Sequence, residues 1–211
     1  MHYLDLAIAG LVGLLTLLVA EFGYRDGWWR GEGARKLVHI AVGIQAAVWP
    51  LYLDWFEIRL ISIVLTIGFI ICMQLRLFQS IGAVQRLSYG EVLFTLMIGA
   101  LTLVTESAAV YAAAMLHLSV ADGLAALIGR GFGRRTSYKV FGHTKSLVGS
   151  GAFFLTSLAI LTGFSLLAPA DLAWWAVVGG AIGATILENI GVMGSDNILV
   201  PAFIVAMLRL V

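Results

Sequence analysis

The chain is built from a series of apolar runs long enough to cross a lipid bilayer, separated by short polar segments. A helix needs about 20 apolar residues to span the hydrocarbon core of a membrane. On this measure we expect eight transmembrane helices, near residues 3–22, 37–53, 58–75, 91–105, 108–128, 147–167, 172–190 and 197–211. Counts of seven or nine also fit the pattern, because 91–105 and 108–128 can be divided differently.

Composition supports a membrane protein rather than a soluble one. Hydrophobic residues make up 61% of the 211 residues and charged residues only 12%, whereas soluble domains carry roughly a quarter. We therefore predict an all-α polytopic bundle that forms one integral membrane domain over residues 1–211. No basic region precedes the first apolar run, so we expect no cleaved signal peptide. The single cysteine, Cys72, cannot form an intramolecular disulfide.

The charges are distributed unevenly along the chain. Eleven of the thirteen Lys and Arg residues lie in or beside the segments 23–36, 76–90 and 129–146. The intervening segments carry Asp54, Glu57, Glu106 and Asp171, with Arg59 as the one cation near them. Basic loops of membrane proteins are predominantly cytoplasmic. The sequence therefore predicts cytoplasmic basic segments and, for eight helices, two outward-facing termini.

Several polar residues occur within or at the ends of the predicted spans, where they are costly. An ionisable side chain at the centre of a membrane helix costs roughly 2.5 kcal/mol or more, and such residues commonly mark a functional site. On the predicted topology they all lie toward the cytoplasmic side: Arg35, Lys36, His39, Glu91, Asp122, Glu188, Asn189, Asp196 and Asn197. The sequence thus predicts one polar site at that side of the bundle.

Most of these residues also have a structural explanation. Arg35 and Lys36 are suited to anchoring a helix among lipid headgroups, and His39 to packing with a hydrogen bond. Glu91 and Asp196 are suited to helix N-termini, where carboxylates are stabilised. Asp122 is different, because it lies within an apolar run of small residues, away from the predicted helix ends. It is the strongest functional candidate.

The segment 129–146 is both basic and rich in glycine. It contains five Arg or Lys residues and leads into the sixth predicted helix through Lys145 and Ser146. A glycine-rich loop before a helix N-terminus is suited to phosphate, although the spacing fits neither a Walker A loop nor a dinucleotide-binding turn. Binding of anionic lipid headgroups is the simpler alternative. Together with the nearby carboxylates, however, the segment indicates phosphate and a divalent cation.

Five motifs resemble the dolichol kinase and phytol kinase family, and they follow that family's order from residue 35 to residue 201. They are R-K-L-V-H (35–39), G-E (90–91), A-D-G-L-A-A-L-I-G-R-G-F-G (121–133), G-H-T-K-S-L-V-G-S (142–150) and D-N-I-L-V-P (196–201). The family includes CTP-dependent polyprenol and diacylglycerol kinases and is distantly similar to phosphatidate cytidylyltransferases. The resemblance implies an all-helical membrane enzyme that phosphorylates a lipid alcohol, using CTP and a divalent cation. The chain is shorter than eukaryotic dolichol kinases, which indicates a minimal core. It lacks the long acidic C-terminal signature of classical phosphatidate cytidylyltransferases, which argues against their activity.

From these observations we assign expected roles to the polar residues. Asp122, with Glu188 or Asp196, is expected to coordinate Mg²⁺, although one carboxylate could instead be the base that orients the lipid hydroxyl. The expected catalytic residues are Asp122, Lys145 and Glu188. The expected nucleotide- and phosphate-binding residues are Arg35, Lys36, Arg130, Gly142, His143, Thr144, Ser146 and Asn197, and the expected supporting residues are His39 and Glu91.

Two other functions fit the same features. A phosphatidate cytidylyltransferase-like enzyme would also bind CTP and Mg²⁺. A membrane transporter would also contain buried charges, but transporters usually show paired half-repeats with sites at the midplane. Phytol, a polyprenol, geranylgeraniol and diacylglycerol all suit an apolar groove, and cations and backbone groups alone would accept ATP as well as CTP. We expect no nucleic-acid partner, and a homo-oligomer is compatible with the sequence.

Overall fold

A computed structural model describes residues 3–29, 31–75, 90–168 and 171–210. The helices are α1 (Tyr3–Arg25), α2 (Glu32–Val48), α3 (Trp55–Leu75), α5 (Gly90–Val104), α6 (Ala108–Leu116), α7 (Asp122–Phe132), α8 (Leu147–Leu167), α9 (Trp174–Ile190) and α10 (Asp196–Leu210). Short 3₁₀ turns cover Trp49–Leu51 and Arg134–Thr136, and a two-stranded antiparallel hairpin is formed by β1 (Ser137–Val140) and β2 (His143–Ser146).

Helices α6 and α7 form one continuous rod. They are joined by a π-helical turn, His117–Ala121, so that the helical stretch runs unbroken over Ala108–Phe132. The described residues therefore form eight rods, and the prediction of an all-helical membrane bundle is confirmed. Four of these helices are long and apolar enough to cross a membrane: Tyr3–Arg25, Trp55–Cys72, Ala108–Phe132 and Leu147–Leu167. The shorter helices α5 and α9 are also apolar.

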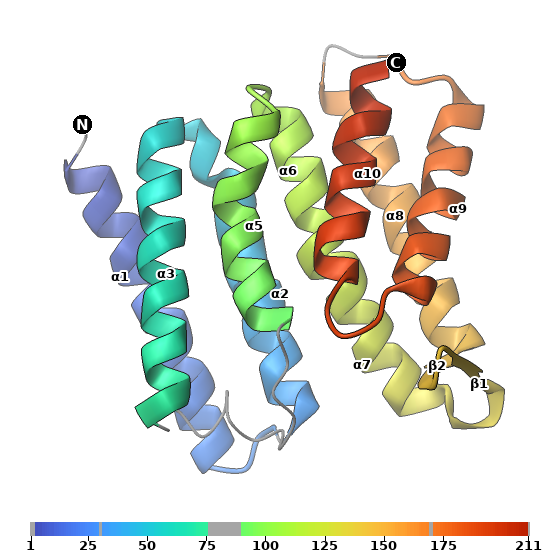
Figure 1. Cartoon of the computed structure of the whole chain (residues 1–211), viewed down its shortest axis with the longest axis horizontal. Coiled ribbons are helices and arrows are strands. Elements are labelled where there is room, and N and C mark those ends of the chain that lie inside the picture. Colours follow the sequence, from blue (N-terminus) through green and yellow to red (C-terminus); the bar gives the residue numbers. More distant parts are fainter. Residues whose placement is uncertain (1–2, 30, 76–89, 169–170, 211) are drawn as a thin grey trace.

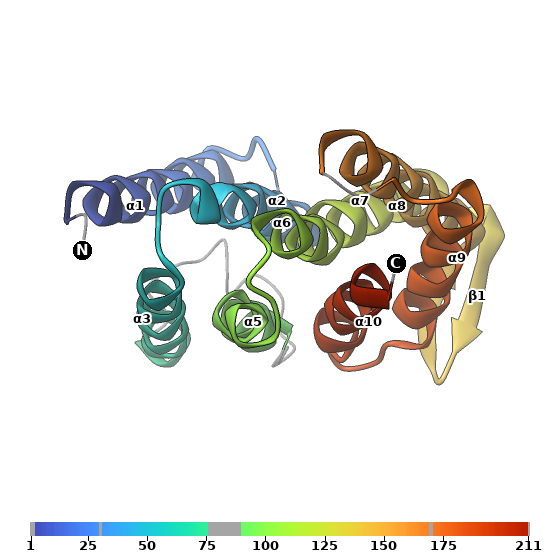
Figure 2. The same cartoon turned by 90° about the horizontal axis from the view of Figure 1, so that it is seen from above.

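The rods lie side by side in two rows. Viewed from above, α1, α2, the α6–α7 rod and α8 form one row, and α3, α5, α10 and α9 form the other (Figure 2). Small residues allow close approach between the helices, as is common in membrane bundles. A Cβ atom on Gly43 would lie 2.0 Å from the Cβ of Ser119, and one on Gly123 would lie 2.3 Å from Ile40 Cγ1.

The polar ends of the rods gather at one end of the bundle. The start of α2, the end of α7, the hairpin, the end of α9 and the start of α10 lie together at the lower end in Figure 1, opposite the two chain termini. The connections that carry Asp54, Glu106 and Asp171 lie at the other end. Arg76 and Arg86, which also belong to the predicted basic side, fall outside the described residues.

Several helix boundaries differ from the predicted spans; α2, for example, ends at Val48 rather than near residue 53. Helix α2 begins at Glu32 rather than near residue 37, and the fifth rod continues to Phe132 rather than ending near 128. In α2 the additional turn contains Arg35 and Lys36, and both are paired with carboxylates on neighbouring helices. Because these charges have partners inside the bundle, the helix can include them.

The predicted loop 129–146 is largely ordered as regular structure. Its first residues complete α7, and its last ones form the hairpin, in which Tyr138 pairs with Lys145. The two-residue turn has positive φ at Phe141 (46°) and Gly142 (81°), the backbone that such a hairpin requires. Two of the glycines serve packing, because a Cβ on Gly133 would lie 2.3 Å from Gly129 O and one on Gly129 would lie 2.9 Å from Ser146 Oγ.

Candidate active site

A cavity of about 1330 Å³, lined by several charged side chains, opens at the basic end of the bundle. Ligand pockets typically measure roughly 300–1,000 Å³, so this one has room for a nucleoside triphosphate. Its walls come from α2, α7, the hairpin, the first turn of α8, the end of α9 and the start of α10. Among its lining residues are Arg35, Lys36, Asp122, Arg130, Arg134, Gly142, His143, Thr144, Lys145, Ser146, Glu188 and Asp196.

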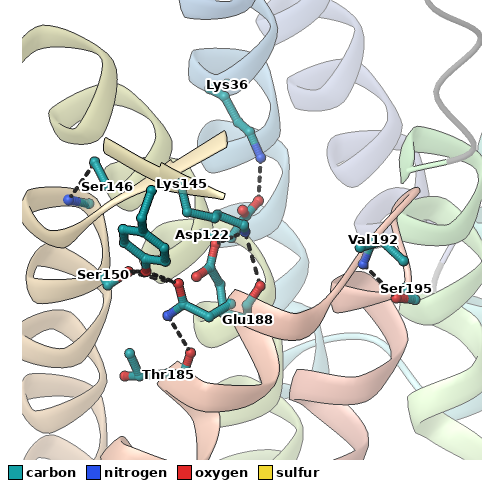
Figure 3. A network of polar contacts seen from close by, with 12 residues as sticks. Lys36, Asp122, Lys145, Ser146, Ser150, Thr185, Glu188, Val192 and Ser195 are labelled. Carbon is teal, nitrogen blue, oxygen red and sulfur yellow. Dashed lines mark hydrogen bonds and ion pairs between the residues drawn. The ribbon is translucent and has the colours of Figure 1, made fainter. Parts of the chain in front are cut away.

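The first charged contact in the cavity is between Lys36 and Asp122. Lys36 Nζ donates a hydrogen bond to Asp122 Oδ2, and both side chains are almost completely buried. His39 lies one turn further along α2, with Nε2 3.5 Å from Asp122 Oδ2 and 2.9 Å from Leu118 O. Asp122 is therefore paired with a lysine from α2, a helix that is distant in the sequence but adjacent in the fold (Figure 3). The sequence had suggested the basic segment 129–146 instead.

The second charged contact joins the hairpin to α9. Lys145 Nζ lies 2.5 Å from Glu188 Oε1 and 3.0 Å from Glu188 O (Figure 3). Burial by itself lowers the pKa of the Lys145 ammonium, but the Glu188 carboxylate outweighs it, and the pKa is raised overall. Lys145 is therefore a cation throughout the physiological pH range and is held at the edge of the cavity.

A hydrogen-bond network fixes the hairpin against α8 and α9. Tyr138 Oη bonds to Asn189 Oδ1 and lies 2.7 Å from Ser150 Oγ, which itself donates to Asn189 Oδ1 at 2.9 Å. Asn189 Nδ2 donates to Thr185 O at 2.8 Å. Because Tyr138 is the cross-strand neighbour of Lys145 and Asn189 follows Glu188, this network sets the position of the Lys145–Glu188 pair.

Besides His39, which is not in the cavity lining, three other predicted site residues lie outside the lining or make a structural contact. Arg35 donates to Glu91, so that Glu91 supports a lining residue without lining the cavity itself. Asn197 donates from Nδ2 to Gly90 O at 2.9 Å and lines a narrow crevice that shares Asp122, Glu188 and Asp196 with the cavity. Ser146 lines the cavity, but its Oγ also accepts from Gly149 N at 3.0 Å and thereby caps α8.

The carboxylates fit a metal–nucleotide complex better than a metal site made by protein alone. Asp122, Glu188 and Asp196 line the same cavity. Across the described ranges, however, no group of three or more His, Cys, Asp or Glu residues is arranged to hold a metal ion. Mg²⁺ commonly takes only one or two carboxylates and completes its shell with phosphate oxygens and water. The donor set is therefore suited to a divalent cation that arrives with phosphate.

Several residues at the site were not among the predicted site residues, including Tyr138, His117 and the cavity-lining Arg134. The hairpin that carries Tyr138 could have been predicted from the sequence, because S-Y-K-V and H-T-K-S flank the two-residue turn F-G. His117 lines the narrow crevice together with Asp122, Glu188, Asp196 and Asn197. It lies in an uninterrupted apolar helical pattern, and nothing in that pattern signals the π-helical turn that it begins.

A comparison with known proteins supports one family. The chain is 32% identical over 194 residues to a phytol kinase from Synechocystis sp. (strain ATCC 27184 / PCC 6803 / Kazusa), an alignment that covers 88% of this chain and 82% of that protein. No family model and no solved structure matches the chain.

Proposed function

The chain belongs to the dolichol kinase and phytol kinase family, and from this premise we propose that it transfers a phosphoryl group from CTP to the hydroxyl of a membrane isoprenoid alcohol. The relative's name favours phytol or a similar alcohol. Polyprenols and diacylglycerol are the other candidates within the family.

The observation that carries the proposal is the pairing of two lysines with two carboxylates around one cavity at one end of the helix bundle. The pairs are Lys36–Asp122 and Lys145–Glu188, with Arg35, Arg130 and Arg134 also in the lining. Phosphoryl transfer is catalysed almost entirely by positioning and by neutralising charge on the phosphates. A cavity that brings cations and carboxylates together can position the phosphates and neutralise their charge.

Each paired residue has an expected task when the nucleotide binds. Lys36 and Lys145 are expected to turn from their carboxylates toward phosphate oxygens, with Arg130 and the backbone of Gly142 close by. Asp122 and either Glu188 or Asp196 are then free to hold a divalent cation, which when bound neutralises the charge on the transferring group. A carboxylate not used for the cation is suited to orient the lipid hydroxyl.

The location of the cavity matches a reaction between a water-soluble donor and a lipid acceptor. The cavity opens at the end of the bundle where the described cations gather, and by the positive-inside rule we expect that end to face the cytoplasm. CTP would enter from this side. The acceptor hydroxyl would come from the bilayer, at about the depth of Asp122.

Purified protein in lipid nanodiscs, supplied with Mg²⁺ and a panel of lipid alcohols, tests the proposal. We expect CDP and a lipid monophosphate when CTP is the donor. Release of pyrophosphate with formation of a CDP-lipid would instead identify a cytidylyltransferase. Absence of any product across the panel would contradict the kinase assignment.

A further inference from the structure

The five cations of the segment 129–146 divide into two groups. Three of them line the large cavity: Arg130, Arg134 and Lys145. The other two, Arg135 and Lys139, are exposed and lie outside that lining. The sequence contains no Asp or Glu over residues 123–170, so this part of the chain offers no carboxylate to neutralise them. The roles proposed above therefore leave Arg135 and Lys139 unexplained.

The hairpin turns Lys139 away from the helix bundle. Neighbouring residues of a β-strand point to opposite faces. Tyr138 points toward α8 and α9, where its hydroxyl group bonds to Ser150 and Asn189, so Lys139 points to the other face. Seen from above, β1 runs along the outer edge of the bundle, beyond α9 (Figure 2). Lys139 is therefore directed toward the surroundings of the protein.

The tip of the hairpin carries an aromatic residue where the backbone favours a small one. Phe141 has a φ of 46°, a left-handed conformation that Asn or Gly adopts readily and a bulky residue adopts at a cost in free energy. Its side chain is also 76% exposed and lies outside the cavity lining. Both features are unfavourable in water. They are explained if the Phe141 ring contacts lipid.

The helices on either side place the hairpin near the membrane surface. Ala108–Phe132 and Leu147–Leu167 are both long and apolar enough to cross a membrane, and the hairpin segment is the short connection between them. A short connection between two spans begins and ends at the same surface of the bilayer. At that depth Lys and Arg attract anionic lipid headgroups, and aromatic side chains are enriched. Cations beside an exposed phenyl ring are thus complementary to an anionic phospholipid.

From these observations we propose that the outer surface of the hairpin, formed by Arg135, Lys139 and Phe141, binds anionic phospholipids of the surrounding membrane. Arg135 and Lys139 contact the headgroup phosphate, and the Phe141 ring inserts among the upper parts of the acyl chains. A zwitterionic lipid is bound less well, because its ammonium group offsets the charge of its phosphate. This interaction does not depend on the kinase function. It supports from outside the same hairpin that carries Lys145 into the cavity.

Fluorescence quenching at the hairpin tip tests the proposal. The Cys72→Ser/Phe141→Cys protein carries a bimane label at position 141 and is placed in nanodiscs of phosphatidylcholine and phosphatidylglycerol. In parallel samples one of the two lipids bears a nitroxide on its acyl chain and quenches the label on contact. We expect phosphatidylglycerol to be preferred at the label by more than about fivefold at low salt, since each cation near an anionic surface contributes roughly this factor. Equal quenching by the two lipids, or no quenching by either, would overturn the proposal.

Two lysine variants of the labelled protein decide which face of the hairpin binds the lipid. Lys139→Gln should lower the preference for phosphatidylglycerol by roughly fivefold. Lys145→Gln removes the same charge from the opposite face, since Lys145 pairs with Tyr138 across the hairpin, and should leave the preference unchanged. Added salt should weaken the preference where Lys139 is present. An equal loss in the two variants would place the lipid in the cavity and overturn the proposal, as would a preference that Lys139→Gln leaves intact. The measurement uses no nucleotide, so its outcome is independent of the kinase function.

Discussion

Lys36 on α2 and Asp122 at the start of α7, which are 86 positions apart in the sequence, form a buried ion pair that connects the two halves of the cavity wall. Each charge is tolerated inside the bundle because the other is present. Removal of one partner from a buried pair leaves an uncompensated charge, which is strongly destabilising. The pair therefore has a structural role as well as its proposed catalytic one.

Asp122→Asn is expected to abolish turnover, because an amide cannot provide the charge that a divalent cation needs. The same substitution leaves Lys36 without its carboxylate and should lower the stability of the protein by about 3–5 kcal/mol, as expected when a buried ion pair loses one partner. The measurements are lipid-phosphate formation and the thermal unfolding midpoint in one detergent.

The double variant Lys36→Met/Asp122→Asn separates these two effects. It replaces both charges, so the unfolding midpoint should return toward that of the wild type while activity stays absent. Activity in Asp122→Asn close to the wild type would exclude Asp122 from the chemistry. A double variant less stable than Asp122→Asn would show that the unpaired lysine is not the cause of instability.

The membrane orientation can be tested through the hairpin. In a Cys72→Ser background, a cysteine at position 139 on β1 should be protected in intact cells from a membrane-impermeant thiol reagent and should react once the cells are opened. A cysteine at position 171, at the opposite end of the bundle, should react in intact cells. The reverse pattern would place the cavity outside the cell, away from cytoplasmic nucleotide.

Much of the bundle could be predicted from hydrophobicity alone, because each rod must present an apolar surface to lipid. This is why the α8 boundaries match the predicted 147–167 and the α9 boundaries nearly match 172–190. The grouping of Asp122, Glu188 and Asp196 could be predicted because successive membrane helices run in opposite directions. The end of one helix and the start of the next therefore lie at the same side of the membrane.

The remaining details depend on contacts between distant residues. The pairing of Lys36 with Asp122, and not with Glu91, is decided by how α2 packs against α7, which no local pattern records. Likewise, a five-residue π turn at His117–Ala121 leaves the apolar pattern of its rod unbroken. The β-hairpin was not predicted, because the many basic and glycine residues of 129–146 are typical of a loop.

Gly131 in α7 and Gly133, which directly follows that helix, provide a matched pair of substitutions. Gly133→Ala would place a Cβ 2.3 Å from both Gly129 O and Ser146 Oγ, so that the start of α8 and the hairpin must shift. Such overpacking typically costs about 1–3 kcal/mol. Gly131→Ala should be tolerated, because no atom lies within 4 Å of its Cβ position. Unfolding midpoints and activity of the two variants, measured side by side, check this; equal behaviour would contradict the described α7–α8 packing.

Tyr138→Phe should loosen the hairpin without removing any group from the cavity lining. The lost hydroxyl bonds to Ser150 and Asn189, and a typical hydrogen bond contributes about 1 kcal/mol. Because the hairpin carries Lys145, we expect a several-fold decrease in kcat with little change in KM for the lipid alcohol. A variant that instead weakens only alcohol binding would show that Tyr138 does not act through Lys145.

Lys145→Ala tests the phosphate-binding role of the cavity. Lys145 is half-buried and paired with Glu188, and its pKa is raised, so it remains a cation at neutral pH. Loss of this charge beside the transferring phosphoryl group should reduce kcat/KM for the nucleotide by more than about tenfold, which corresponds to ~1.4 kcal/mol. Lys139→Ala is the control, since Lys139 lies on the same hairpin but is exposed and outside the cavity lining. Equal losses in the two variants would indicate a general effect of positive charge on the hairpin.

The Lys145→Ala variant also tests which nucleotide is the phosphoryl donor. Cations and backbone groups hold phosphates without distinguishing the base, so a preference for CTP over ATP must be read by other contacts. Lys145→Ala should therefore lower the rates with CTP and ATP by the same factor and leave their ratio unchanged. We expect the wild type to favour CTP and to release CDP. Exclusive use of ATP would leave the role of Lys145 intact but contradict CTP as the donor, and a changed CTP-to-ATP ratio in Lys145→Ala would place this lysine near the base instead of the phosphates.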